Sequence, residues 1–236
     1  MYRFEKAGSG VAALELVMQP TRGGRAEYIP SARRSLDLIR LMDVCIALAA
    51  LIFLAPLMIL AAACVRLQDG GPALFSHERI GRGGRTFKCL KFRSMVLNSS
   101  NRLAELLAKD PAARAEWERD RKLRRDPRIT PLGVFLRKSS VDELPQLINI
   151  LRGDMSLVGP RPIVDDEAAK YGRFFRYYAA VAPGLTGVWQ ASGRNDVDYR
   201  QRVAMDVLYV RRRSLAFNFL IILKTVPAVL FRSGSY

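Results

Sequence analysis

The sequence is poor in the residues that most metal and redox sites use. It contains one histidine, His77, and three cysteines among 236 residues. A single histidine excludes a multi-histidine metal site within one chain and argues against a histidine-based catalytic triad. The cysteines Cys45, Cys64 and Cys89 are odd in number and lack the spacing of metal ligands. They indicate reduced thiols in a cytosolic setting.

Two common sequence signals are also missing. No Gly-Lys-Ser/Thr follows the glycine-rich residues 81–85, which excludes a Walker loop. These residues are either a loop that contacts phosphate or a basic hairpin turn between two short extended segments. No signal peptide is expected in residues 1–32, because the apolar core comes too late and is too long. We expect these residues to form a weakly ordered leader.

Acidic residues are scarce relative to basic ones. The chain has 38 Lys and Arg against 22 Asp and Glu, a formal net charge of +16 and a pI of about 10.4. This surplus indicates a polyanionic partner, which is nucleic acid, anionic lipid headgroups or a phosphorylated substrate. The length suits one domain, or one domain with an appendage, and the 50% apolar content is enough for a core.

Residues 44–65 contain no charged or strongly polar side chain. This is close to the ~20 residues that a helix needs to cross a bilayer core. A single span with the basic remainder in the cytoplasm would leave Arg33, Arg34 and Arg40 outside, against the positive-inside tendency. Pro56 lies in the middle of the run and predicts a kink. A helix–break–helix hairpin that enters and leaves the same membrane face removes the conflict and is favoured.

Two adjacent carboxylates, Asp142 and Glu143, lie between basic Arg137 and a second arginine, Arg161. The apolar spacing that follows Pro145 predicts a buried helix, with the pair at its start, where free N–H groups and the helix dipole favour negative charge. Carboxylates held there beside arginines can act as a nucleophile and a metal ligand toward a phosphate. The alternative is capping, with Asp142 as N-cap and Glu143 as first-turn dipole partner, and spacing alone favours it.

Three further segments are expected to be helical. Residues 101–125 are charged and are expected to break at Asp110-Pro111. Residues 165–181 interleave aromatic and basic side chains, which suits either a membrane-interface position or packing on the core. The nearly apolar residues 215–231 predict an interfacial or core helix.

Three ordered motifs, LKFRSM at 90–95, SSVDELPQLINILRGDMSLVGPRP at 139–162 and PGLTGVWQASGR at 183–194, resemble the bacterial sugar transferase family, the monotopic phosphoglycosyl transferases that act on polyprenyl phosphate. The resemblance covers the chain from about residue 33 onward. It implies an α/β fold, mostly helical with a small sheet. A re-entrant membrane helix hairpin at 33–70 would follow the leader and join a compact cytosolic catalytic domain with interfacial amphipathic helices at 71–236.

The resemblance also implies roles for individual residues. Asp142 would be the nucleophile, and Glu143 its partner in the dyad, helping to hold Mg²⁺. Binding of substrate phosphates would fall to a set of cations: Lys91, Arg93, Arg137, Arg161 and Arg194. This sequence departs from its relatives at Ala55-Pro56, where many carry Ser-Pro, at His77, where most carry glutamine, and at Asn218, where aspartate is frequent.

The reaction implied by the resemblance has two steps. The aspartate attacks the sugar-bearing phosphate of a UDP-sugar and releases UMP, and polyprenyl (undecaprenyl) phosphate then attacks the covalent intermediate. The complete reaction begins the assembly of a lipid-linked polysaccharide or glycan. The expected partners are therefore UDP-sugar, polyprenyl phosphate and the lipids of the bacterial inner membrane, with the catalytic domain on its cytoplasmic face, no nucleic acid and room for a homo-oligomer. The alternative is a membrane-tethered basic protein that binds anionic lipid or nucleic acid without catalysis.

Overall fold

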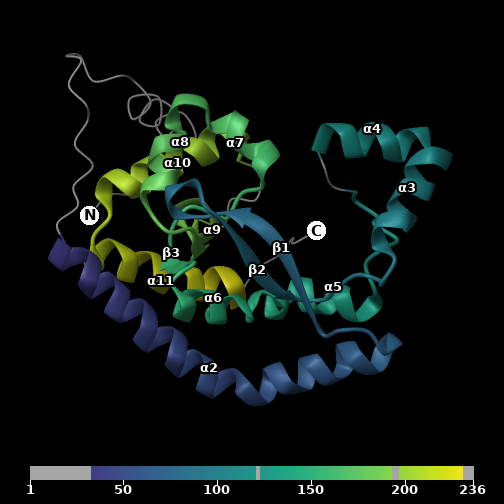
Figure 1. Ribbon diagram of the computed structural model, residues 1–236, viewed down its shortest axis with the longest axis horizontal. Coiled ribbons are helices and arrows are strands. Elements are labelled where there is room, and N and C mark those ends of the chain that lie inside the picture. Colours follow the sequence, from purple (N-terminus) through teal and green to yellow (C-terminus); the bar gives the residue numbers. More distant parts are fainter. Residues whose placement is uncertain (1–32, 121–122, 193–196, 231–236) are drawn as a thin grey trace. The chain divides into compact units, whose positions relative to one another are not determined.

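The computed structural model describes residues 33–120, 123–192 and 197–230 (Figure 1). The leader expected over 1–32, and Arg194, lie outside the described residues. The described residues divide into two compact units: unit 1 combines 33–52, 77–89, 146–192 and 197–230, and unit 2 combines 53–76, 90–120 and 123–145. The boundaries expected near residues 32 and 70 stay predictions.

The described residues are mostly helical with two small two-stranded sheets, which confirms that part of the expected fold class. Helix α2 (Arg33–Asp69) and strands β1 (Leu74–Ile80) and β2 (Thr86–Phe92) run through both units. Unit 2 also contains α3 (Ser99–Lys109), α4 (Pro111–Asp120), α5 (Pro131–Lys138) and the 3-10 turn η2 (Val141–Glu143). Unit 1 also contains η1 (Arg82–Gly84), α6 (Gln146–Arg152), β3 (Ser156–Val158), α7 (Asp165–Tyr171), η3 (Gly172–Phe174), α8 (Phe175–Ala180), β4 (Gly184–Thr186), α9 (Val188–Ala191), α10 (Tyr199–Arg212) and α11 (Leu215–Leu230).

Helix α2 contains the apolar run 44–65. It is 37 residues long. Its stretch Asp37–Asp69 is long and apolar enough to cross a membrane, and only 11% of the most apolar part is buried. The side chains of Ile52, Phe53 and Ile59 are 70%, 82% and 69% exposed, whereas the helix of a soluble core would bury them. The length, apolar composition and exposure of α2 suit a membrane anchor.

Pro56 lies inside α2, and the helix continues across it. The sequence predicts a break at this position, whereas the structure keeps one helix through the proline. Proline removes one backbone hydrogen bond and can bend a helix without ending it. The re-entrant path of the chain through the membrane stays a prediction.

Asp43 ties the N-terminal half of α2 to the rest of unit 1. Its side chain is buried, Oδ2 accepts a hydrogen bond from Ser156 Oγ at 2.7 Å, and Oδ1 accepts one from the Leu157 N–H at 3.0 Å. On the preceding turn, Arg40 donates to two backbone carbonyls at the C-terminal end of α6, at 2.5 and 2.8 Å. The Leu151 carbonyl lies in the last turn of α6, where carbonyls lack an intrahelical donor, and the Ile150 carbonyl also accepts from the Gly153 N–H at 3.0 Å. The beginning of α2 is therefore held by β3 and α6.

Replacing Asp43 by alanine is expected to destabilise unit 1. The change leaves the buried Leu157 N–H and Ser156 hydroxyl without their acceptor, which costs about 1–3 kcal/mol. Thermal unfolding in detergent should show a lower Tm for Asp43→Ala, and a smaller decrease for Asp43→Asn, whose carbonyl can still accept. Asp37→Ala, which removes an exposed carboxylate from the same helix, is the control. Equal Tm values for Asp43→Ala and the control would show that the buried bonds do not stabilise the unit.

Strands β3 and β4 pair in parallel, with Ser156 opposite Gly184 and Val158 opposite Thr186. Helix α11 packs on both strands and on α9, and α10 packs on α8 and α9. Asn218 of α11 is fully buried, and its Oδ1 lies 3.1 Å from the Tyr209 hydroxyl. The position where relatives often carry aspartate is thus part of the packed interior of unit 1.

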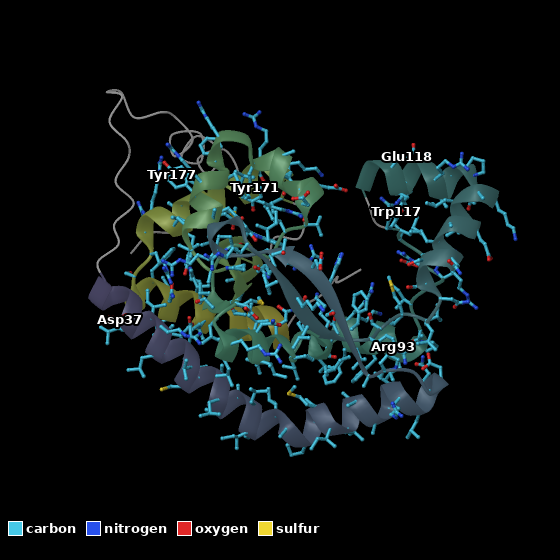
Figure 2. The ribbon with its side chains drawn as sticks, viewed as in Figure 1. Asp37, Arg93, Trp117, Glu118, Tyr171 and Tyr177 are labelled. Carbon is cyan, nitrogen blue, oxygen red and sulfur yellow. The ribbon has the colours of Figure 1, made fainter. Side chains whose placement is uncertain are left out.

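The aromatic segment 165–181 contributes largely to the core of unit 1. Tyr171, Tyr177 and Tyr178 are buried, and Figure 2 shows the first two on the helices that cover this unit. The Tyr178 hydroxyl donates to the Ile80 carbonyl at 2.6 Å, which joins α8 to the end of β1. For these three tyrosines the core-packing alternative is confirmed.

Unit 2 has a smaller core formed by Ala61 and Val65 of α2, Phe92 of β2 and Leu136 of α5.

The glycine-rich residues 81–85 of unit 1 make the turn between β1 and β2. A hydrogen bond from the Gly81 N–H to the Arg85 carbonyl, at 2.7 Å, closes the turn. The turn matches the basic-hairpin alternative, and its contact with phosphate stays a prediction.

Candidate functional site

Asp142 and Glu143 lie in the 3-10 turn η2 of unit 2, and the Asp142 side chain is buried. Leu144 and Pro145 separate the turn from α6, so the pair precedes that helix and is not part of its first turn. The residue that precedes η2 is Ser140, and its side chain makes no capping bond. Asp142 lies inside the turn, so the expectation that it acts as an N-cap is wrong.

The backbone just before the pair is strained. Ser140 has φ 57° and ψ 13°, and it is the one non-glycine residue with positive φ among those that the structure describes. A side chain in this left-handed region costs ~1–3 kcal/mol and persists where the surroundings enforce it. The turn is closed by a hydrogen bond from the Glu143 N–H to the Ser140 carbonyl at 3.2 Å. Strain of this kind gathers at functional sites, and here it lies two residues before Asp142.

Lys91 of β2 reaches Glu143. Its Nζ lies 2.6 Å from Glu143 Oε1, and each side chain is about a quarter exposed. A charge-assisted bond of this length fixes the Glu143 carboxylate and keeps one positive charge beside the pair. Lys91 thus lies beside the acidic pair, and its expected contact with a substrate phosphate stays a prediction.

Arg137, in the last turn of α5, lies in the same unit. Its Nε donates to Ser94 Oγ at 2.8 Å. Burial lowers the pKa of Arg137, and the negative charges of Asp142 and Asp126 oppose this shift. Asp126 is already paired with Arg128, at 2.6 Å. The Arg137 side chain therefore lies within electrostatic reach of Asp142.

Arg93 differs from the expected role in phosphate binding. Its Nη1 and Nη2 form a bidentate pair with Asp69, both at 2.5 Å. Its Nε donates to Pro72 O at 2.8 Å, Nη2 also donates to Val65 O at 3.2 Å, and Nη1 also donates to Met95 O at 3.3 Å. These bonds use every N–H donor of the guanidinium. Arg93 (labelled in Figure 2) therefore fastens the C-terminal end of α2 to unit 2, and we leave it out of the substrate contacts.

Arg161 belongs to unit 1, in the loop that follows β3. Its side chain is exposed, and its guanidinium carbon lies 5.9 Å from the centre of the Trp189 ring. Arg202 of α10 approaches the same ring at 4.9 Å. Sequence reasoning missed Arg202 and Ser94. Ser94 lies within the motif LKFRSM, which could have identified it, whereas Arg202 lies in no motif.

The acidic pair fits the ligand set of a magnesium ion in part. Mg²⁺ binds proteins through one or two carboxylates and completes its shell with water and substrate phosphates. The Glu143 side chain is about a quarter exposed. Within the described ranges no group of three or more His, Cys, Asp or Glu could hold a metal by itself. A metal at this site would thus depend on the substrate for most of its ligands.

A family model described as bacterial sugar transferase matches residues 34–232. The chain is 54% identical over 204 residues to an undecaprenyl-phosphate galactose phosphotransferase of Salmonella typhimurium, covering 86% of this chain and 43% of the relative. It is 52% identical over 197 residues to the exopolysaccharide production protein ExoY of Sinorhizobium fredii, covering 84% of this chain and 87% of the relative.

A third relative is a UDP-glucose:undecaprenyl-phosphate glucose-1-phosphate transferase of Caulobacter vibrioides, 39% identical over 216 residues, which are 88% of this chain and 75% of the relative. The lengths differ among these proteins. The chain spans less than half of the Salmonella relative, and most of the Sinorhizobium one.

Proposed function

The chain belongs to the bacterial sugar transferase family, and from this membership we propose that it transfers a sugar-1-phosphate from a UDP-sugar to polyprenyl phosphate. The names of its relatives support undecaprenyl phosphate as the acceptor, a UDP-sugar as the donor and exopolysaccharide production as the process. The sugar differs among them, since galactose, glucose and N-acetylgalactosamine are all named. The sugar that this chain transfers is therefore open.

The observation that carries the proposal is the surroundings of the acidic pair. Asp142 is buried in a strained turn within electrostatic reach of Arg137, and Glu143 is fixed by Lys91. A carboxylate becomes an effective nucleophile toward a phosphate only when cations neutralise the approaching negative charge. Two cations beside two carboxylates supply this condition.

In the first step an Asp142 carboxylate oxygen attacks the phosphorus that bears the sugar. The bond from this phosphorus to the bridging oxygen breaks, and UMP leaves with the electron pair. In the second step a phosphate oxygen of polyprenyl phosphate attacks the same phosphorus, and the Asp142 carboxylate is released. The products are UMP and a polyprenyl diphosphate sugar, so each bond made is matched by one broken.

Arg137 and Lys91 neutralise negative charge in this reaction and do not transfer protons. Arg137 presents its Nη donors to the phosphate that is attacked, and its bond to Ser94 keeps the guanidinium in place. Lys91 balances the charge of Glu143 and keeps this carboxylate from repelling the substrate. Glu143 would hold a Mg²⁺ ion, which when bound neutralises charge on the diphosphate.

The anchoring of α2 supports the re-entrant topology. Near its beginning, Asp43 is bonded to Ser156 and Leu157 of β3, and at its end Asp69 is bonded to Arg93, the residue that follows β2. Both partners follow α2 in the sequence. A helix that crossed the bilayer would separate its beginning from segments that follow its end. We propose that both ends of α2 lie on the cytoplasmic face of the bacterial inner membrane, with the catalytic residues.

The test is a reaction of the purified protein with UDP-glucose, UDP-galactose and UDP-N-acetylhexosamines. We expect one donor to release UMP when undecaprenyl phosphate is present. Without the acceptor, intact-protein mass spectrometry should detect a phosphosugar adduct, because the first step does not need it. Release of UDP in place of UMP, or no release from any donor, would contradict the proposal.

The alternative is a tethered basic protein that binds polyanions without catalysis, and the net charge of +16 favours it. Such a protein would bind nucleic acid or anionic vesicles with a strong salt dependence and would consume no UDP-sugar. The donor assay separates the two functions directly.

A further inference from the structure

Two arginines of unit 1 approach the Trp189 ring. The guanidinium carbon of Arg202 is 4.9 Å from the ring centre, and that of Arg161 is 5.9 Å from it. Trp189 is only 8% exposed and packs against Val197 and Met205, so the ring itself has little freedom. A cation over an indole face is attracted by the ring quadrupole, and tryptophan is the strongest of the aromatic partners.

The backbone at Arg161 is fixed independently of its side chain. The Gly159 N–H donates to the Thr186 carbonyl at 2.9 Å, and the Gly184 N–H donates to the Pro160 carbonyl at 2.8 Å. A Cβ at Gly159 would lie 2.6 Å from the Ala182 carbonyl oxygen, closer than real Cβ atoms approach. The loop that contains Gly159 and Pro160 therefore packs closely against the backbone of β4. Because the backbone is fixed, the direction of the Arg161 side chain depends on the side chains that it contacts.

Arg202 is anchored at the beginning of α10. Asp198 caps this helix, with its Oδ1 accepting from the Gln201 N–H at 2.7 Å. The Arg202 Nε donates to the Val197 carbonyl at 3.2 Å, which places the guanidinium plane over the ring. The side chain is half-buried, whereas Arg200 on the same turn is exposed. Arg202 is thus held by the backbone beside Trp189 and contacts its ring.

Arg161 has no carboxylate partner in the part of the chain that the structure describes. The nearby charge is another cation: burial lowers the pKa of Arg79, and the charge of Arg161 lowers it further. Arg79 already contacts Glu167 at 3.8 Å. An exposed guanidinium with a like charge nearby and no carboxylate partner among the described residues can bind an added anion through its N–H donors.

We propose that Arg202 is a positioning residue for Arg161: it holds the Trp189 ring, and the ring orients the Arg161 guanidinium toward a phosphate of the donor. Arg202 makes no contact with the ligand in this arrangement. The inference rests on the proposed function in one respect, namely that the anion bound by Arg161 belongs to a UDP-sugar.

Kinetics give the first test. Arg202→Ala should raise KM for the UDP-sugar about 3- to 30-fold, the range of a cation–π contact, and change kcat by less than about threefold. In an Arg161→Ala background the same change should have little further effect, because the two residues act through one contact. Arg202→Lys keeps the charge but not the flat guanidinium, so it should restore KM in part. Arg200→Ala, which removes an equal charge from the same helix, should leave KM unchanged.

Trp189 fluorescence gives a second test that needs no turnover. The sequence has two tryptophans, so Trp117→Phe leaves Trp189 as the reporter. Titration with UDP should change its emission, and Arg202→Ala should shift the half-saturating concentration about 3- to 30-fold, in step with KM. If Arg202→Ala does not fold, Arg202→Lys carries both tests.

The outcomes separate this inference from the proposed function. A UDP-dependent emission change that Arg202→Ala weakens, without UMP release from any donor, would support the positioning role and contradict the reaction. UMP release with KM and emission equal in Arg202→Ala and Arg200→Ala would support the reaction and overturn the positioning role. Additive effects of Arg161→Ala and Arg202→Ala on KM would also overturn it.

Discussion

Asp142→Asn is expected to abolish the phosphosugar adduct and to lower UMP release by at least about a thousandfold, because an amide cannot serve as the nucleophile. The substitution is nearly isosteric. The buried position should therefore accept it without loss of the fold, and the effect should appear in kcat with the thermal stability kept. Mass spectrometry of the protein after incubation with the donor alone measures the adduct, and UMP release measures turnover.

Two variants make the Asp142 result specific. Asp110→Asn applies the same chemical change to an exposed carboxylate of unit 2 that accepts from the Ala112 N–H at 2.9 Å, and asparagine caps a helix as well as aspartate does. It should retain full activity. Asp142→Glu keeps the charge but moves the carboxylate by one methylene, so we expect a large decrease in turnover with a trace of adduct. Normal turnover by Asp142→Asn would remove Asp142 as the nucleophile.

The acidic pair could be identified from the sequence, but its surroundings could not. The residues Asp142 and Glu143 are adjacent, and an ordered motif set marks them, so residue type and order suffice. That Lys91 reaches Glu143, and that Arg137 is steadied by Ser94, depends on how β2 and α5 fold together. Spacing alone carries no information about such contacts.

Two errors at the site have physical causes. Asp142 was expected as a possible N-cap because an acidic residue before an apolar run is typical of helix starts. The left-handed conformation of Ser140 turns the chain earlier, so the pair falls inside a 3-10 turn. Arg93 lies in a motif that also contains Lys91, and motif membership cannot separate an arginine with open donors from one whose donors are all used by Asp69 and backbone carbonyls.

The fold was more predictable where local signals are strong. Asp110-Pro111 ends α3 and begins α4 as expected, because proline has no N–H to donate and suits the first position of a helix. The glycines of 81–85 likewise mark the hairpin turn, where Gly83 has φ 72°. Pro56, unlike Pro111, lies inside a long apolar helix and does not end it. Proline thus marks a helix boundary at Pro111 but not at Pro56, where the helix tolerates the loss of one backbone hydrogen bond.

Gly133→Ala is expected to be the most destabilising small substitution in unit 2. A Cβ at this position would overlap the Ser94 carbonyl oxygen and lie 2.7 Å from the Ser94 carbonyl carbon. Both are backbone atoms, so no rotamer change relieves the clash. Overpacking of this kind costs about 3 kcal/mol or more, a decrease in Tm of about 6–12 °C. Turnover should fall as well, because moving α5 away from Ser94 breaks the bond that holds Arg137.

Two control variants, Gly71→Ala and Val134→Ala, show whether the backbone clash causes the decrease in Tm. Gly71→Ala also meets a close atom, Leu97 Cδ2, but this belongs to an exposed side chain that can move aside. Val134→Ala shortens an exposed side chain on α5 and keeps the helix. Both should lower Tm by less than about 3 °C. A Tm for Gly133→Ala within that range would mean that α5 can leave Ser94 freely, and the bond from Arg137 to Ser94 would then not be needed to place the guanidinium beside Asp142.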